Sequence, residues 1–306
     1  MYRKQTDLAL EGRELHPHSG KNDGLEAVER IFFGISVTEL VVSAGQGEQN
    51  SGKPAGHYFT LDVGNAWQAH KEGFDAASKA IAEVLSHLLP TGDGCVLVAG
   101  LGNRQLSADS LGPLTVEQVL VTRHIRILDG HMFASAGWGE VAAVAPGVLA
   151  QTGMESAEII QSVVNKIRPK CVIAVDALAS RRLRRLATTV QISDTGISPG
   201  AGVSNHRRKL NQEVLGVPVI ALGIPTVVDA ATLAYDLLEE ATVEETCLEQ
   251  AVQKLLDTGT GKDFFVSPKD SDGLALQGAR LLATGINLAL HPEISPEELT
   301  ELRLGM

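Results

Sequence analysis

Two aspartates stand where the sequence offers acid–base chemistry. Asp176 directly follows the continuously apolar run 171–175, and Asp109 lies in the polar loop 103–113 that follows the apolar run 95–99. Such runs are typical of strands buried on both faces of a parallel sheet, and open α/β sheets place their active sites just beyond the carboxyl ends of these strands. Two carboxyl groups that converge there can share a proton, so that one activates a water while the other polarises a scissile carbonyl. Asp109 and Asp176 are therefore candidate catalytic residues.

Each aspartate also has a structural interpretation. Asp109 could cap a helix that starts near Leu111, and Asp176 could pair with the basic run 181–185. Such a run is usually a solvated helix face, although its place directly after Asp176 also suits the binding of an acidic substrate. Both alternatives remain open at the level of the sequence.

Other site chemistries find less support. The loop 100–105 has two glycines of a dinucleotide motif but Gln105 in place of the third, so we expect a glycine turn and no nucleotide cofactor. Ser180 and Ser204 lack a G-x-S-x-G elbow, and no His pair forms H-E-x-x-H. His131 and His206, both expected in loops, could approach the aspartates, and Asp109, Asp176 and His206 could form an oxygen-rich metal set. No ligand spacing is diagnostic of a metal, however.

The elements that must position the aspartates alternate between strand and helix. Short apolar runs predict strands, and apolar residues at three- and four-residue steps predict helices. The predicted strands are 31–37 with 40–42, 57–63, 95–99, 141–144, 171–175 and 217–222, and the predicted helices are 74–88, 114–123, 155–168 and 274–290. Residues 1–28 are expected to be an extension and 43–56 a long loop. We therefore predict an α/β fold: a single domain with a mostly parallel sheet and helices on both faces.

Charge and composition exclude several classes of function. The net charge of −11 argues against non-specific binding to nucleic acid or to an anionic membrane, because both need a basic surface. No apolar run approaches the roughly 20 residues of a membrane helix. The N-terminus lacks the apolar region of a signal peptide, and the three cysteines are far apart, which predicts a cytoplasmic protein without disulfides.

Beyond these patterns, the chain contains a series of ordered sequence blocks. They are Thr6–Glu11, Val98–Asn103, Asp109–Pro113, Val175–Arg181, Gln191–Ile197, Pro199–Val203, Gly223–Asp229 and Phe264–Lys269. Together they resemble the germination protease family of spore-forming bacteria, in order from residue 6 to about residue 290.

The resemblance implies a spore endopeptidase that degrades small acid-soluble spore proteins at germination, in the cytoplasm of the forespore and spore core. It implies a fold related to the hydrogenase maturation proteases, a homotetramer, and catalytic aspartates at Asp109 and Asp176. It also implies a zymogen that cleaves its own Asp7–Leu8 bond, so that residues 1–7 are a short prosegment and 8–306 the peptidase domain. The pepsin-like motif 194–196 is then structural.

Two other functions compete with this one. A maturation peptidase of the hydrogenase type would cut one partner protein once. A non-catalytic nucleotide-binding α/β protein would bind a nucleotide tightly and cut nothing.

Overall fold

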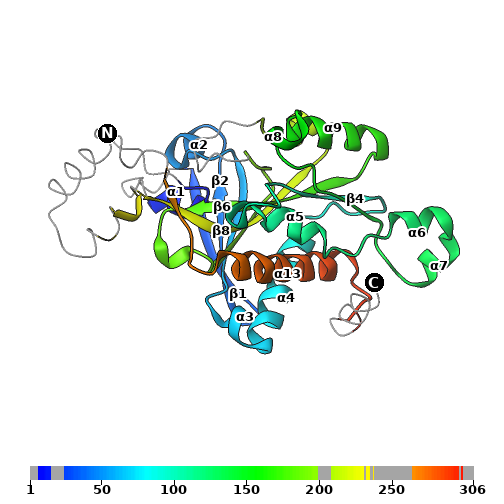
Figure 1. The fold of residues 1–306 in the computed structure, drawn as a ribbon, viewed down its shortest axis with the longest axis horizontal. Coiled ribbons are helices and arrows are strands. Elements are labelled where there is room, and N and C mark those ends of the chain that lie inside the picture. Colours follow the sequence, from blue (N-terminus) through cyan, green and yellow to red (C-terminus); the bar gives the residue numbers. More distant parts are fainter. Residues whose placement is uncertain are drawn as a thin grey trace.

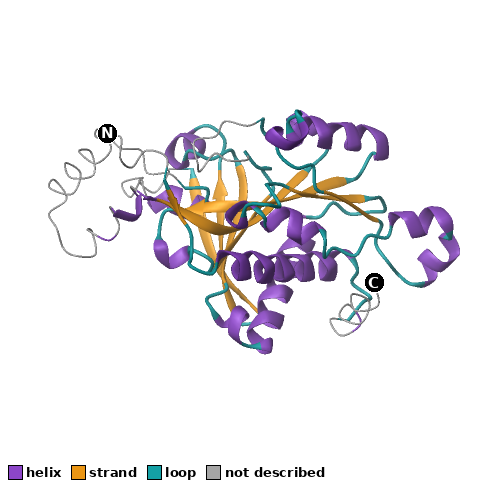
Figure 2. Cartoon of the chain, viewed as in Figure 1, coloured by secondary structure: helices purple, strands orange, loops and turns teal. Residues whose placement is uncertain are grey.

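The computed structural model describes residues 6–14, 24–198, 208–230, 232–234, 237, 264–295 and 298. In these residues the chain forms a nine-stranded sheet in the order β1-β2-β3-β7-β8-β6-β4-β5, with β9 paired to β8. Figures 1 and 2 show helices above and below this sheet. The expected α/β fold with helices on both faces is confirmed.

The parallel half of the sheet consists of β5 (Val141–Val144), β4 (Val96–Gly100), β6 (Cys171–Ser180) and β8 (Val219–Asp229). Alternate side chains of β4 enter two different cores: Val96 and Val98 belong to one, Leu97 and Ala99 to the other. A strand covered on both faces needs apolar residues at every position, which is why these runs were recognisable in the sequence.

The other half is antiparallel and consists of β7 (Thr189–Ser193), β3 (Gly56–Asp62), β2 (Ile35–Val42) and β1 (Leu25–Phe32). The short β9 (Phe265–Val266) pairs with β8 in the same sense. The predicted strand 31–37 is wrong, because the chain reverses at Phe33 and Gly34, whose φ angles are 52° and 84°. Two consecutive positive φ angles form the tight turn that suits a hairpin.

Three helices cover one face of the sheet: α4 (Lys71–Leu88), α5 (Leu111–Val116) and α13 (Ser271–Leu290). Helices α4 and α13 lie side by side (Figure 1), and a Cβ at Gly285 would be only 2.5 Å from Cγ2 of Ile81. The other face carries α9 (Ser156–Ile167) and α10 (Gln212–Leu215) over the parallel strands. The described residues also form shorter elements: α3 (Ala66–Ala69), α6 (Arg123–Leu128), α7 (Gly130–Ser135), α8 (Leu149–Thr152), and the 3-10 turns η1 (Ser107–Asp109) and η2 (Leu183–Arg185).

The helix predicted over 114–123 is wrong. α5 ends at Val116, and tertiary hydrogen bonds then take the backbone out of the helix: the N–H of Leu120 donates to Oδ1 of Asn287, and that of Thr122 to the carbonyl of Val141. Such long-range partners are invisible to local periodicity.

The N-terminal region also differs from the prediction. Residues 9–14 form α1 (Ala9–Glu14), and Leu8, Ala9 and Glu11 have no exposed surface. The expected loop 43–56 contains α2 (Gln46–Ser51), which ends at a left-handed Gly52. Residues near the start of the chain are therefore packed on the antiparallel half of the sheet, on the face that also carries Leu40, Val42 and Tyr58.

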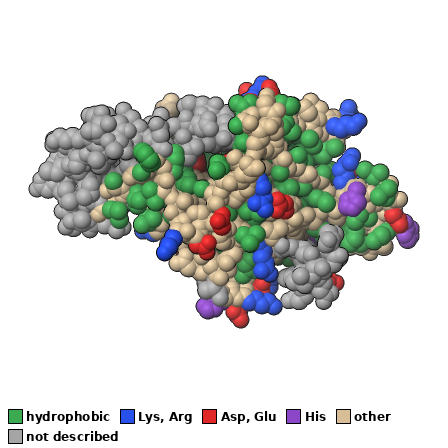
Figure 3. Space-filling model, viewed as in Figure 1, with side chains coloured by type: hydrophobic (Ala, Val, Ile, Leu, Met, Phe, Trp, Pro, Cys, Tyr) green, Lys and Arg blue, Asp and Glu red, His purple; other side chains and the backbone are tan. Residues whose placement is uncertain are grey.

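The surface is mixed in charge. On the face shown in Figure 3, basic and acidic side chains are interspersed and form no single basic patch. Within the described ranges, no helix combines the length and the apolar character needed to cross a membrane.

Candidate active site

The sequence predicted Asp176 just beyond the end of its strand, but the residue lies inside β6. The strand continues to Ser180 because β8 pairs with it over that length, whereas β4 pairs with it only as far as Gly100, opposite Val175. Asp176 is therefore the first residue of β6 beyond β4. Its carboxyl group is almost buried, and its Oδ1 accepts the N–H of Ala177 at 2.9 Å.

Asp109 ends the 3-10 turn η1, which precedes α5. Its Oδ2 accepts the N–H of Asn103 at 2.9 Å. The backbone at residue 102 can come this close to Asp109 only as glycine. The φ of Gly102 is +110°, and a Cβ there would be 2.1 Å from the carbonyl oxygen of Asp109. The N-cap of α5 is Ser110. The interpretation of Asp109 as the cap of this helix is therefore wrong.

The backbone that follows β4 contacts both aspartate-bearing elements. The N–H of Leu101 donates to the carbonyl of Val175 at 2.8 Å, next to Asp176, and two residues later Asn103 binds Asp109. The carbonyl of Val175 would also be 2.5 Å from a Cβ at Gly112. The loop after β4 and strand β6 thus meet at one edge of the sheet, as the topology argument requires.

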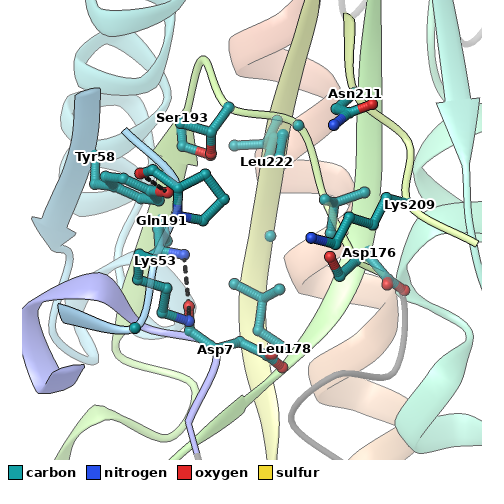
Figure 4. A pocket seen from close by; sticks show the side chains of 18 residues that line it. Asp7, Lys53, Tyr58, Asp176, Leu178, Gln191, Ser193, Lys209, Asn211 and Leu222 are labelled. Carbon is teal, nitrogen blue, oxygen red and sulfur yellow. Dashed lines mark hydrogen bonds between the residues drawn. The ribbon is translucent and has the colours of Figure 1, made fainter. Parts of the chain in front are cut away.

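A pocket of about 200 Å³ opens beside Asp176. Its walls carry polar side chains from both halves of the sheet and from the N-terminal segment, among them Asp7, Lys53, Tyr58, Asp176, Gln191 and Lys209. In Figure 4, Asp7 and Lys53 lie on one side of the pocket, Asp176 and Lys209 on the other, and Leu178 between them. Asp109 does not line this pocket. A cleft shared by the two aspartates therefore stays a prediction.

Small residues of β8 leave room for the pocket. Ala221 and Gly223 line it, and a Cβ on Gly223 would lie 2.4 Å from the carbonyl oxygen of Asp176 and 2.7 Å from Cγ of Leu178. Glycine is therefore the residue that fits between Asp176 and Leu178.

Asp7 is fixed on β6 by two hydrogen bonds. Its N–H donates to the carbonyl of Ala179 at 2.9 Å, and its Oδ2 accepts the N–H of Ala179 at 2.8 Å. The pairing of β6 with β8 is irregular between Leu178 and Ala179. This local irregularity accompanies the docking of the N-terminal segment.

The carbonyl oxygen of Asp7 has two side-chain donors. Nζ of Lys53 lies 2.9 Å from it and Nε2 of Gln191 lies 3.0 Å from it. Lys53 also donates to the carbonyl of Thr6 at 3.1 Å, and Oε1 of Gln191 accepts the N–H of Ala9 at 2.6 Å. Burial lowers the pKa of Lys53, and the nearby carboxylates of Asp7 and Glu11 partly oppose that shift.

Glu11 anchors the other end of the segment. Its fully buried carboxylate accepts the N–H of Arg181 at 2.6 Å and that of Arg182 at 2.8 Å, and the hydroxyl of Thr6 also donates to it. The guanidinium of Arg185 lies 3.5 Å away. The basic run 181–185 is therefore not a solvated helix face. It holds an acidic side chain of the chain itself.

A sequence model of the germination protease family matches residues 5–240. The chain belongs to the germination protease family. It is 40% identical to a germination protease of Clostridium perfringens, with 98% of this chain and 99% of the relative covered, and 39% identical to that of Caldanaerobacter subterraneus subsp. tengcongensis, with 97% of both covered. The germination protease of Bacillus pumilus is 34% identical, with 97% of this chain and 96% of the relative covered.

A solved structure of a NiFe hydrogenase maturation protease from Thermococcus kodakarensis was also found. Its TM-score is 0.36 at 16% identity, with 66% of this chain and 98% of that chain covered.

The remaining candidate residues of this chain lie away from the pocket or outside the described residues. His131 is exposed on α7, not in a loop, and does not line the pocket, and His206 lies outside the described residues. Oδ1 of Asp194 accepts the N–H of His57 at 2.8 Å and ties the end of β7 to β3. In the part of the chain that the structure describes, no group of three His, Cys, Asp or Glu is placed to hold a metal ion.

Lys53 and Gln191 were not found from the sequence. Lys53 stands in a glycine-rich stretch, and Gln191 lies in β7, a strand that was not predicted from the sequence. One signal was present: Thr189, Gln191 and Ser193 alternate with apolar residues, and every residue of β7 is buried. Buried polar side chains need partners, so this alternation indicates a polar contact on one face of the strand.

Proposed function

We propose that this protein is an endopeptidase that degrades small acid-soluble spore proteins, made as a zymogen that removes residues 1–7 by cutting its own Asp7–Leu8 bond. The observation that carries the proposal is that Asp7 and Asp176 line the same pocket. Family membership supports a protease, and the resemblance extends the proposal to a homotetramer in the cytoplasm of the forespore and spore core.

In this mechanism Asp176 is the general base, because its carboxyl group lies at the pocket and a water there can reach it. Asp109 is the second carboxyl group, held by the N–H of Asn103 next to the same sheet edge. Two neighbouring carboxylates do not both ionise easily, so the pair works with one group neutral and one ionised. Hydrolysis then proceeds through an activated water, without a covalent intermediate.

The test uses the chain that begins at Leu8, incubated with a small acid-soluble spore protein, with the products identified by mass spectrometry. We expect several cuts in the substrate, and for Asp176→Asn a rate reduced by about 10²–10⁴-fold, the usual contribution of a general base. The melting temperature of the variant checks that it folds. A variant that keeps activity within about tenfold of the wild type contradicts the role of Asp176.

The same experiment separates the alternatives. A maturation peptidase of the hydrogenase type leaves spore proteins intact and makes one cut in one partner. A nucleotide-binding protein without catalysis cuts neither, and its melting temperature rises with added nucleotide because ligands stabilise the folded state.

A further inference from the structure

The bond proposed for self-cleavage has an unusual environment at its carbonyl group. The oxygen of Asp7 belongs to the Asp7–Leu8 peptide bond, and it accepts one hydrogen bond from an ammonium group and one from a side-chain amide, at 2.9 and 3.0 Å. The two donors come from separate elements: Lys53 follows α2, and Gln191 lies in β7. Two side-chain donors thus converge on the one oxygen that would gain negative charge if water attacked this bond.

We infer that Lys53 and Gln191 are catalytic residues of self-cleavage that stabilise the oxyanion formed on the carbonyl oxygen of Asp7. The inference rests on the proposed function, because it concerns the same bond. Donors that are already aimed at a developing charge in a site partly screened from water strengthen as the charge grows. An ammonium group adds a full positive charge to the effect of the amide.

Gln191 also fixes the bond on both sides. Its Nε2 donates to the carbonyl that precedes Leu8, and its Oε1 accepts from the N–H of Ala9, which follows Leu8. The side chain of Leu8 has no exposed surface and the amide of Gln191 is nearly buried. The two contacts of the amide therefore bracket Leu8 and hold the Asp7 carbonyl in place.

The presence of these two donors changes which groups are expected to polarise the carbonyl of Asp7. From the sequence, one aspartate is expected to activate water and the other to polarise the carbonyl. At the described pocket, Asp176 is present and Asp109 is not, whereas the carbonyl of Asp7 already has Lys53 and Gln191. Polarisation of this carbonyl is thus assigned to the ammonium and the amide.

The reaction balances with these groups. The oxygen of water bonds to the carbonyl carbon of Asp7 while a proton passes to the carboxylate of Asp176, and the π electrons of the C=O bond move to the oxygen between Lys53 and Gln191. Re-formation of the C=O bond breaks the C–N bond. The nitrogen of Leu8 leaves with the proton from Asp176, which gives a carboxyl end at Asp7 and an amine at Leu8.

The test follows the loss of residues 1–7 from the full-length chain by intact-protein mass spectrometry, as a first-order rate. Lys53→Met and Gln191→Met are each expected to slow this rate by about 10²–10³-fold, the effect of removing one oxyanion donor. Lys53→Gln keeps a donor without the charge and is expected to fall between Lys53→Met and the wild type. Lys79→Met, on the exposed side of α4, is the matched control and is expected to process at the wild-type rate.

A second measurement separates catalysis from docking. Hydrogen exchange of residues 8–11 reports whether the segment stays on the sheet, and we expect Lys53→Met and Lys53→Gln to keep that protection while they lose rate. Processing of Lys53→Met within about tenfold of the wild type overturns the inference, as does a loss of rate that only parallels a loss of protection. A wild-type chain that never cuts Asp7–Leu8 contradicts the proposed function and the inference with it, whereas unaltered variants beside an active wild type contradict the inference alone.

Discussion

Replacement of Glu11 by Gln tests how the N-terminal segment is held. The carboxylate accepts two backbone N–H groups, at 2.6 and 2.8 Å, in a fully buried position. Each hydrogen bond to a charged group contributes about 1.5–3 kcal/mol, and a buried donor left without a partner costs about 1–3 kcal/mol. Gln has one acceptor oxygen, so one N–H of Arg181 or Arg182 would face an NH2 group. The docked segment should therefore lose roughly 3–5 kcal/mol, or about 10²–10⁴-fold in its docking equilibrium.

Hydrogen exchange followed by mass spectrometry measures this loss directly on peptides that contain residues 8–14. We expect faster exchange in Glu11→Gln by about two to four orders of magnitude where local opening governs exchange. Glu26→Gln, at an exposed position of β1, serves as the control because it keeps the same change of charge. Equal protection in the two variants would refute the argument that Glu11 anchors the segment.

Two further predictions concern the pocket and the response to pH. Gly223→Ala places a Cβ 2.4 Å from the carbonyl oxygen of Asp176, so we expect the free energy of unfolding to fall by about 1–3 kcal/mol in urea titrations, as is usual for overpacking. Gly130→Ala, where nothing lies within 4 Å, should not lower it, and equal stabilities of the two variants would refute the close fit. Burial lowers the pKa of His291 below its usual 6.5, so the folded protein keeps this side chain neutral while the unfolded chain takes up a proton below that pH. The free energy of unfolding should therefore fall as the pH drops below about 6.5, by at most about 1.4 kcal/mol per pH unit. Urea titrations between pH 7.5 and 5.5 would show a smaller fall in His291→Gln, and an identical fall would contradict this role.

The parallel half of the fold could be predicted because its strands are apolar at every position. β4 and the first half of β6 were recognisable from this feature, and α4, α9 and α13 from their periodicity. The second half of β6 and the whole of β7 could not, because their buried polar residues break the pattern. Gln191 is tolerated there only because Asp7 and Ala9, more than 180 residues away, satisfy its amide.

The candidate site was predictable to the same extent. The elements that carry Asp109 and Asp176 meet beyond β4, and this was predictable because it depends only on which strands are parallel neighbours. The position of Lys53 depends on how a glycine-rich loop folds over the first residues of the chain, and no local signal reports such a contact. The anchoring role of the Glu11 carboxylate was equally unpredictable, since a single Glu in a polar segment resembles a solvated residue.

The contacts that Ala9 makes with Gln191, and Glu11 with Arg181 and Arg182, survive a cut at Asp7–Leu8, because their partners lie far from residues 1–7 in the chain. The new N-terminus would then be a tethered product that stays bound to its own enzyme. An intramolecular ligand on a short connection acts at an effective concentration of roughly millimolar. A foreign peptide that uses the same contacts would have to compete with this tethered product, so the Michaelis constant of a processed enzyme would contain the cost of displacing its own first residues.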